Sequence, residues 1–125
     1  MLYPARLRYQ VIDGSKQMTL CGCMVQAGQI SDAEVHSLEQ GLSAISNSHF
    51  GEPAQVSWTT IAAGNGWTCG EPSTSSIVVM YVPPGLEQPE RTVLLQAICD
   101  LWTSTTGCSI AEIVATARDL PNQEN

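Results

Sequence analysis

Residues 76–118 read SIVVMYVPPGLEQPERTVLLQAICDLWTSTTGCSIAEIVATAR. The β-branched and aromatic content of 76–82 predicts a strand, and 112–118 predicts a second one. Between them, a helix is predicted to begin at Glu87-Gln88-Pro89, where proline suits the first turn, and to stop at Gly107. Its buried face is expected to hold Leu94, Leu95, Ile98, Leu101 and Trp102. The segment is therefore a strand–helix–strand (βαβ) unit.

The same order of elements occurs earlier in the chain. Ser31-Asp32-Ala33-Glu34 is a capping box and predicts the start of a helix that ends near residues 47–51. Strands are predicted on either side of this helix, at 18–27 and 54–61. The apolar face of the helix is expected to hold Val35, Leu38, Leu42 and Ile45.

One offset of 57 residues relates the two units. It places Gly28 on Gly85, Val25 on Val82, Leu38 on Leu95, Ile45 on Trp102 and Val56 on Ile113. We therefore expect tandem βαβ units with right-handed crossovers. The predicted fold class is α+β, with a four-stranded mixed sheet, two helices on one face, and an added N-terminal strand or hairpin.

Three segments lie outside the two units. Residues 5–12 alternate in polarity and Asp13-Gly14 is a turn signal, so 1–18 are predicted to be an extension that forms a strand or hairpin. Residues 62–72 are rich in Gly, Asn and Pro and are predicted to be a loop. Residues 122–125 are predicted to be a polar tail.

The charge of the chain is unevenly distributed. It has five basic and twelve acidic residues, for a net charge of −7. Residues 1–16 carry Arg6, Arg8 and Lys16 against Asp13, a net charge of +2, and the rest carries −9. This balance excludes a nucleic-acid partner, because no basic stripe is present, and no apolar run is long enough for a membrane span.

The five cysteines are odd in number and contain no CxxC pair, which argues against a disulfide framework or a zinc ribbon. Because 1–16 are charged and lack an apolar core, no signal peptide is predicted, and we expect a cytoplasmic protein with reduced thiols. No metal and no cofactor is predicted. Arg118 and Asp119 are neighbours and are expected to form an ion pair.

Five segments resemble the tautomerase superfamily, in particular its two-unit members typified by cis-3-chloroacrylic acid dehalogenase. They are Ala54-Gln55-Val56-Ser57-Trp58, Ala63-Gly64-Asn65-Gly66-Trp67, the strand at 77–82 that leads into Gly85, Gly85-Leu86-Glu87-Gln88-Pro89-Glu90-Arg91 and Arg118-Asp119-Leu120-Pro121. The fourth is similar to the family's Gly-Arg-Ser-x-Glu-Gln-Lys. The resemblance covers residues 19–121 and implies one tautomerase-like domain, with units at 19–61 and 76–118, that assembles as a homotrimer.

The chemistry that the resemblance implies depends on an N-terminal proline amine, which acts as a base or an acid, and on arginines that bind a substrate carboxylate. The proline position falls at Thr19, and the two arginines fall at Pro83 and Leu86. A histidine position falls at Ser46 and its arginine neighbour at Asn47. A tyrosine position falls near Thr116. These six positions are candidate pocket residues, but their side chains differ from those of the family.

Three further residues complete the candidate site. Arg6 and Arg8 share one face of the predicted N-terminal strand and are either replacement anion-binding groups or solvated surface charges. Trp67 either walls a ligand pocket or packs on a neighbouring subunit.

Two functional hypotheses follow, with the catalytic residues unknown in both. In the first, the chain is a family member without proline-dependent chemistry that has a pocket for a small carboxylate. In the second, it is a low-activity isomerase, dehalogenase or decarboxylase that uses other residues around the same pocket. A cysteine-based redox role is a third, weaker alternative.

Overall fold

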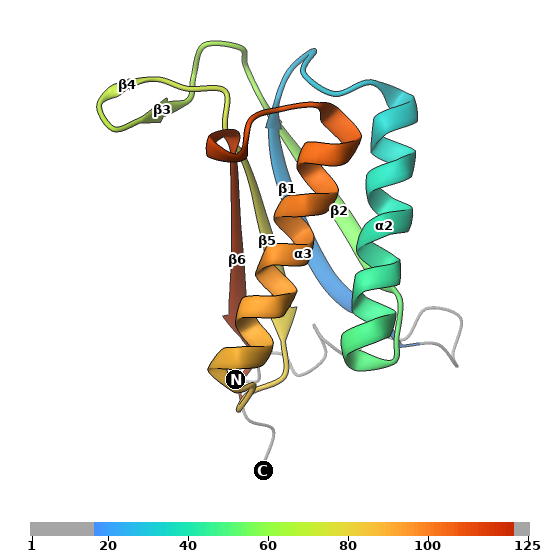
Figure 1. Cartoon of the computed structure of the whole chain (residues 1–125). Coiled ribbons are helices and arrows are strands. Elements are labelled where there is room, and N and C mark those ends of the chain that lie inside the picture. The colour runs from blue at the N-terminus through green and yellow to red at the C-terminus, as the bar shows by residue number, and fades with distance from the viewer. Residues whose placement is uncertain (1–16, 122–125) are drawn as a thin grey trace.

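The computed structural model describes residues 17–121 and confirms the predicted fold class. Figure 1 shows two helices in front of one four-stranded sheet, with a small hairpin projecting beside it. The elements are β1 (Thr19–Gln26), α2 (Asp32–Phe50), β2 (Ala54–Ile61), β3 (Trp67–Thr68), β4 (Glu71–Pro72), β5 (Ser76–Val82), α3 (Gln88–Thr106), the 3-10 helix η1 (Ile110–Glu112) and β6 (Ile113–Asp119). The predicted N-terminal strand and the tail lie outside the described residues.

The strand order is β2-β1-β5-β6. Within each unit the strands are parallel, and the two units meet where β1 pairs antiparallel with β5. The start of β1 and the end of β5 therefore lie at the same end of the sheet. We call this the Thr19 end; it is the lower end in Figure 1.

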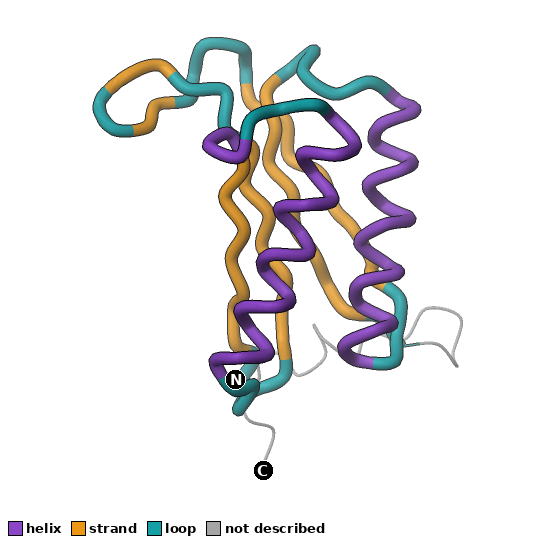
Figure 2. Tube along the Cα trace, viewed as in Figure 1, coloured by secondary structure: helices purple, strands orange, loops and turns teal. Residues whose placement is uncertain are grey.

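The core lies between the sheet and the helices, which cover the same face (Figure 2). Every second residue of β1 and β5 faces it, so these strands alternate buried and more exposed positions. The helices contribute three fully buried residues each; these are Leu38, Leu42 and Ser46 from α2 and Leu94, Ile98 and Trp102 from α3.

The predicted helix ends are confirmed. Ser31 Oγ accepts from the Glu34 N–H at 3.1 Å, and Glu34 accepts from the Ser31 N–H at 2.9 Å. Gly51 and Gly107 end the two helices in the left-handed conformation, with φ of 74° and 75°. Glycine suits this conformation because it has no Cβ.

The single offset of 57 residues is wrong for the helices. Thr19 and Ser76 do start equivalent strands, but Leu38 occupies the position of Leu94 rather than Leu95, and Ser46 that of Trp102. The β2 start, Ala54, corresponds to Ile113. The reason is element length: β5 is one residue shorter than β1, so α3 begins one residue earlier relative to its strand, and the 3-10 helix η1 lengthens the link between α3 and β6.

Two smaller expectations also need correction. The segment 62–72, predicted to be a loop, contains the β3–β4 hairpin. Leu95 and Leu101 are half-buried rather than core residues. None of the described helices has the length and apolar content needed to cross a membrane.

Candidate functional site

The topology brings four of the predicted pocket residues to the Thr19 end of the molecule. Thr19 begins β1, while Pro83 and Leu86 follow β5. Ser46 lies in the last two turns of α2, which also ends there (Figure 1). Trp67 does not join them, because the β3–β4 hairpin lies at the opposite end, where its indole is 66% exposed. Arg6 and Arg8 lie outside the described residues.

Both the backbone N–H and the side chain of Thr19 are used in structural hydrogen bonds. The residue is completely buried, and its backbone N–H donates to the Pro53 carbonyl at 2.9 Å. Its Oγ1 donates to Glu52 Oε2, also at 2.9 Å. The Thr19 nitrogen, where the sequence resemblance places the family's proline, is therefore an amide within the sheet, and an amide nitrogen has no basic lone pair for proton transfer.

Ser46 and Asn47, although adjacent, have different surroundings. Ser46 is completely buried, and its Oγ has no hydrogen-bond partner among the described residues. Asn47 is exposed and lines an open groove of about 540 Å³ between α2 and the edge strand β2. His36 and Glu39 line the same groove, but Glu39 already accepts from Trp58 Nε1 at 2.8 Å.

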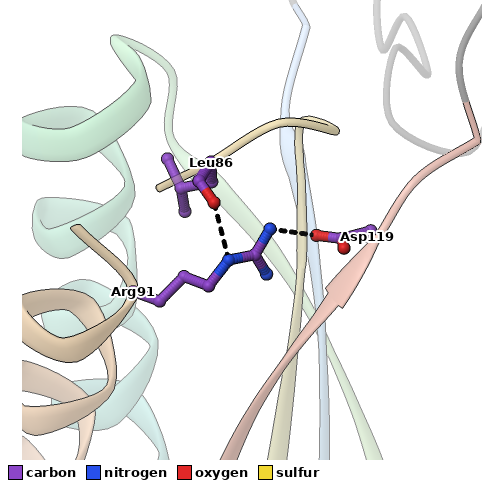
Figure 3. A network of polar contacts seen from close by, with 3 residues as sticks. All are labelled: Leu86, Arg91 and Asp119. Atoms are coloured by element: carbon purple, nitrogen blue, oxygen red, sulfur yellow. Dashed lines mark hydrogen bonds and ion pairs between the residues drawn. The ribbon is translucent and has the colours of Figure 1, made fainter. Parts of the chain in front are cut away.

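Leu86 contributes its carbonyl oxygen to a polar network at the Thr19 end. Figure 3 shows Arg91 between Leu86 and Asp119. The Arg91 Nε donates to the Leu86 carbonyl at 2.7 Å, and Nη2 lies 2.7 Å from Asp119 Oδ1. The guanidinium thus ties the β5–α3 loop to the end of β6. The expected Arg118–Asp119 pair is wrong, because successive residues of a strand point to opposite faces.

Arg118 points to the face of the sheet that no described helix covers. Its guanidinium carbon lies 5.6 Å from the centre of the Tyr81 ring, within the range of a cation–π contact. No acceptor among residues 17–121 forms a hydrogen bond or ion pair with it. Of the two arginines in this part of the chain, Arg118 is therefore the one without a carboxylate partner.

The uncovered face can be described as three rows across β2, β1, β5 and β6. The rows are Thr59–Met24–Ile77–Val114, then Ser57–Gly22–Val79–Thr116, then Gln55–Leu20–Tyr81–Arg118 nearest the Thr19 end. The first row is mostly apolar, the second is small, and the third is mainly polar or aromatic. Thr116, a predicted pocket residue, lies in the second row, where its Oγ1 donates to the Val78 carbonyl at 3.3 Å.

A depression of about 210 Å³ lies over the second and third rows. Its lining includes Leu20, Gly22, Gln55, Ser57 and Tyr81. It exists because Gly22 has no side chain: a Cβ there would meet only Ser57 Oγ, at 4.0 Å. Sequence reasoning missed Gln55 and Tyr81 as site residues, although the strand alternation places both on this face.

A second cavity, of about 280 Å³, lies at the opposite end of the sheet. Among its lining residues are Gln29, Thr74 and Glu112. The Glu112 carboxylate accepts from the Ser109 N–H at 2.8 Å and from Thr74 Oγ1 at 2.7 Å, and these bonds lower its pKa. Gln29 donates to the Thr74 carbonyl. These contacts hold the loops together and give the cavity a structural explanation.

The cysteines form neither a disulfide nor a metal site in the described residues. Cys21 and Cys23 are buried on the core face of β1. A hydrogen bond with Cys21, and then burial, raise the pKa of the Cys23 thiol. Cys69, at the tip of the hairpin, is exposed. A cysteine-based active site has no support in this arrangement.

No family model and no curated protein matches the chain. Solved structures do. Native Ps01740 matches with a TM-score of 0.76 and 26% identity, over 82% of this chain and 94% of that one. N1, a member of the cis-3-chloroacrylic acid dehalogenase (cis-CaaD) family, matches with a TM-score of 0.75 and 15% identity, over 82% and 75%. The Q0 fused 4-OT wild type symmetric trimer matches with a TM-score of 0.73 and 19% identity, over 82% of this chain and 85% of that one. The resemblance inferred from the sequence is confirmed at the level of the fold.

Proposed function

We propose that this chain, which has the fold of the tautomerase superfamily, binds a small carboxylate and does not use proline-dependent chemistry. One observation carries the second part: the Thr19 N–H is buried and donates to the Pro53 carbonyl. General base catalysis needs a nitrogen with a free lone pair within reach of the substrate. An amide that is buried as a donor meets neither condition.

The carboxylate is supported by the fold relatives. One relative belongs to a family named for a chlorinated carboxylic acid, so a carboxylate ligand is the natural expectation for this fold. Pro83 and Leu86 occupy the positions of the family's two arginines, and neither side chain carries a charge. Another cation must therefore bind the carboxylate.

Self-association as a homotrimer is a third part of the proposal. A similar fused 4-OT is a symmetric trimer. In this chain the first row of the uncovered face holds Met24, Ile77 and Val114, with exposed fractions of 37%, 38% and 43%. Three apolar side chains in register across three strands make a surface that association would remove from water.

The test combines binding and turnover. We expect crotonate, a flat four-carbon carboxylate, to bind saturably in an NMR titration. We expect phenylenolpyruvate, 2-hydroxymuconate and the 3-chloroacrylates to show no turnover above the solvent rate. Turnover that disappears in Ser46→Ala or Asn47→Ala would instead support the low-activity enzyme. Absence of carboxylate binding would overturn the proposed function.

A further inference from the structure

The uncovered face of the sheet has one charged residue. Every other position that β1, β2, β5 and β6 present to this face is uncharged, and that residue is Arg118. The whole chain carries −7, so an anion is repelled from most of its surface. An anionic ligand is therefore most favourably placed where a cation stands among neutral side chains.

We infer that the carboxylate ligand binds in the depression above Gly22, with Arg118 as its counter-charge. This inference rests on the proposed function and gives that function a location. It moves the ligand away from Thr19 and onto the opposite face of the sheet. The groups that bind would come from β6, β5 and β2.

Arg118 contacts Tyr81, which lines the depression. The two residues are paired in the β5–β6 register, and the guanidinium lies over the ring at 5.6 Å. A stacked guanidinium uses its face for the aromatic contact and keeps the N–H groups at its edge for a carboxylate, which it can grip with two parallel hydrogen bonds. Arg91 is not equivalent, because Asp119 and the Leu86 carbonyl already occupy its donors.

The depression supplies neutral groups and room. Arg118 is not one of its lining residues; it reaches the depression through Tyr81, which lines it and has the guanidinium over its ring. Tyr81, Ser57 and Gln55 bring a phenol, a hydroxyl and an amide to its wall. A volume of about 210 Å³ accommodates a carboxylic acid of a few carbons. If a trimer covers this face, the guanidinium also loses water, and a bound carboxylate would offset that desolvation.

Two substitutions test the location in the full-length protein, with crotonate as the probe. Arg118→Gln should raise the crotonate Kd by about tenfold or more, because a charge-assisted pair is lost. Gly22→Val should fill the depression and abolish binding. It should remain folded, since a Cβ at Gly22 meets only Ser57 Oγ at 4.0 Å and valine favours strands.

Two controls accompany these variants. Lys16→Gln also removes one positive charge. It should leave the crotonate Kd within twofold of wild type, which corresponds to a change of about 0.4 kcal/mol in binding free energy. Crotonamide, which is neutral and has nearly the same shape, should bind wild type about tenfold or more weakly than crotonate.

The outcomes separate the two claims. If wild type binds crotonate and the affinity survives both Arg118→Gln and Gly22→Val, the location is wrong while carboxylate binding stands. If affinity is lost only in the Arg6→Ala/Arg8→Ala double variant, the N-terminal arginines bind the ligand and the location is again wrong. If wild type binds no crotonate, the proposed function itself fails.

Discussion

Arg91 joins the β5–α3 loop to the end of β6 at the Thr19 end, and this contact with Asp119 could not be inferred from the sequence around Arg91. Its side chain is only 18% exposed, and its guanidinium bonds both to a loop carbonyl and to the Asp119 carboxylate. We expect Arg91→Ala to lower the free energy of unfolding by about 1–2 kcal/mol, because the Leu86 carbonyl and Asp119 both lose a partner. Asp119→Asn should cost about 0.5 kcal/mol, since this side chain is half exposed and solvent screens the pair.

Urea denaturation measures both values. Arg118→Ala is the matched control, because it removes the same kind of side chain from a position without an ion pair in the described structure, and it should change stability by less than about 0.5 kcal/mol. If Arg91→Ala were no more destabilising than Arg118→Ala, the structural role assigned to Arg91 would be wrong.

The thiols should differ in reactivity by their surroundings. A hydrogen bond with Cys21 and burial raise the pKa of the Cys23 thiol, so little thiolate forms near neutral pH. Cys69 is exposed at the hairpin tip. We expect Ellman's reagent to label Cys69 first and to leave Cys21 and Cys23 unlabelled until urea unfolds the chain.

Cys69→Ser is the check on this assignment, because it should remove the fast phase of labelling. Persistence of that phase in the variant, or labelling of Cys23 in the native protein, would contradict the described burial.

Among the secondary-structure elements, the helices begin and end at capping residues that can be recognised in the sequence. The Ser31 hydroxyl and the Glu34 carboxylate close a capping box at the start of α2. Ser31→Ala should therefore lower the unfolding free energy by about 1 kcal/mol. Ser48→Ala, on the exposed side of the same helix, should have almost no effect when both are followed by thermal or urea unfolding. Equal effects of the two changes would argue against the cap.

Single helices and strands are easier to predict from the sequence than the alignment of the two units or the contacts between side chains. Caps, glycines and alternating strands are local, so α2, α3 and the four strands of the sheet were found. The single 57-residue offset fails because the first strand and the link after the helix differ in length between the units, and no local pattern in the sequence indicates these differences. Arg118 was paired with Asp119 because they are adjacent, although the strand sends them to opposite faces.

The candidate site was predicted only in part for the same reason. Thr19, Ser46, Pro83 and Leu86 were expected together, and the topology places them at one end. Tyr81 and Gln55 were missed, because a depression beside a glycine depends on cross-strand register. Register follows from pairing over long sequence distances.

For the whole molecule, the proposed assembly and the proposed ligand site both involve the uncovered sheet face. Met24, Ile77 and Val114 form its apolar row, and Ile77 stands between the other two. We expect Ile77→Lys to convert the trimer to monomers, because it places three charges on surfaces that association would bury. Analytical ultracentrifugation measures the change.

Val93→Lys is the matched control for assembly. Val93 is 60% exposed and lies on α3, away from the uncovered face, so this variant should remain trimeric. A wild type that sediments as a monomer, or an Ile77→Lys variant that remains a trimer, would show that this face does not mediate association.

The central claim is that this chain keeps the tautomerase fold while its carboxylate site lies away from the buried Thr19 amide. The most direct measurement is a crystal structure of the full-length protein grown with crotonate. We expect the crotonate carboxylate to lie against the Arg118 guanidinium, above Gly22 and beside Tyr81. Crotonate bound beside Thr19 and Leu86, with Arg118 unoccupied, would contradict it.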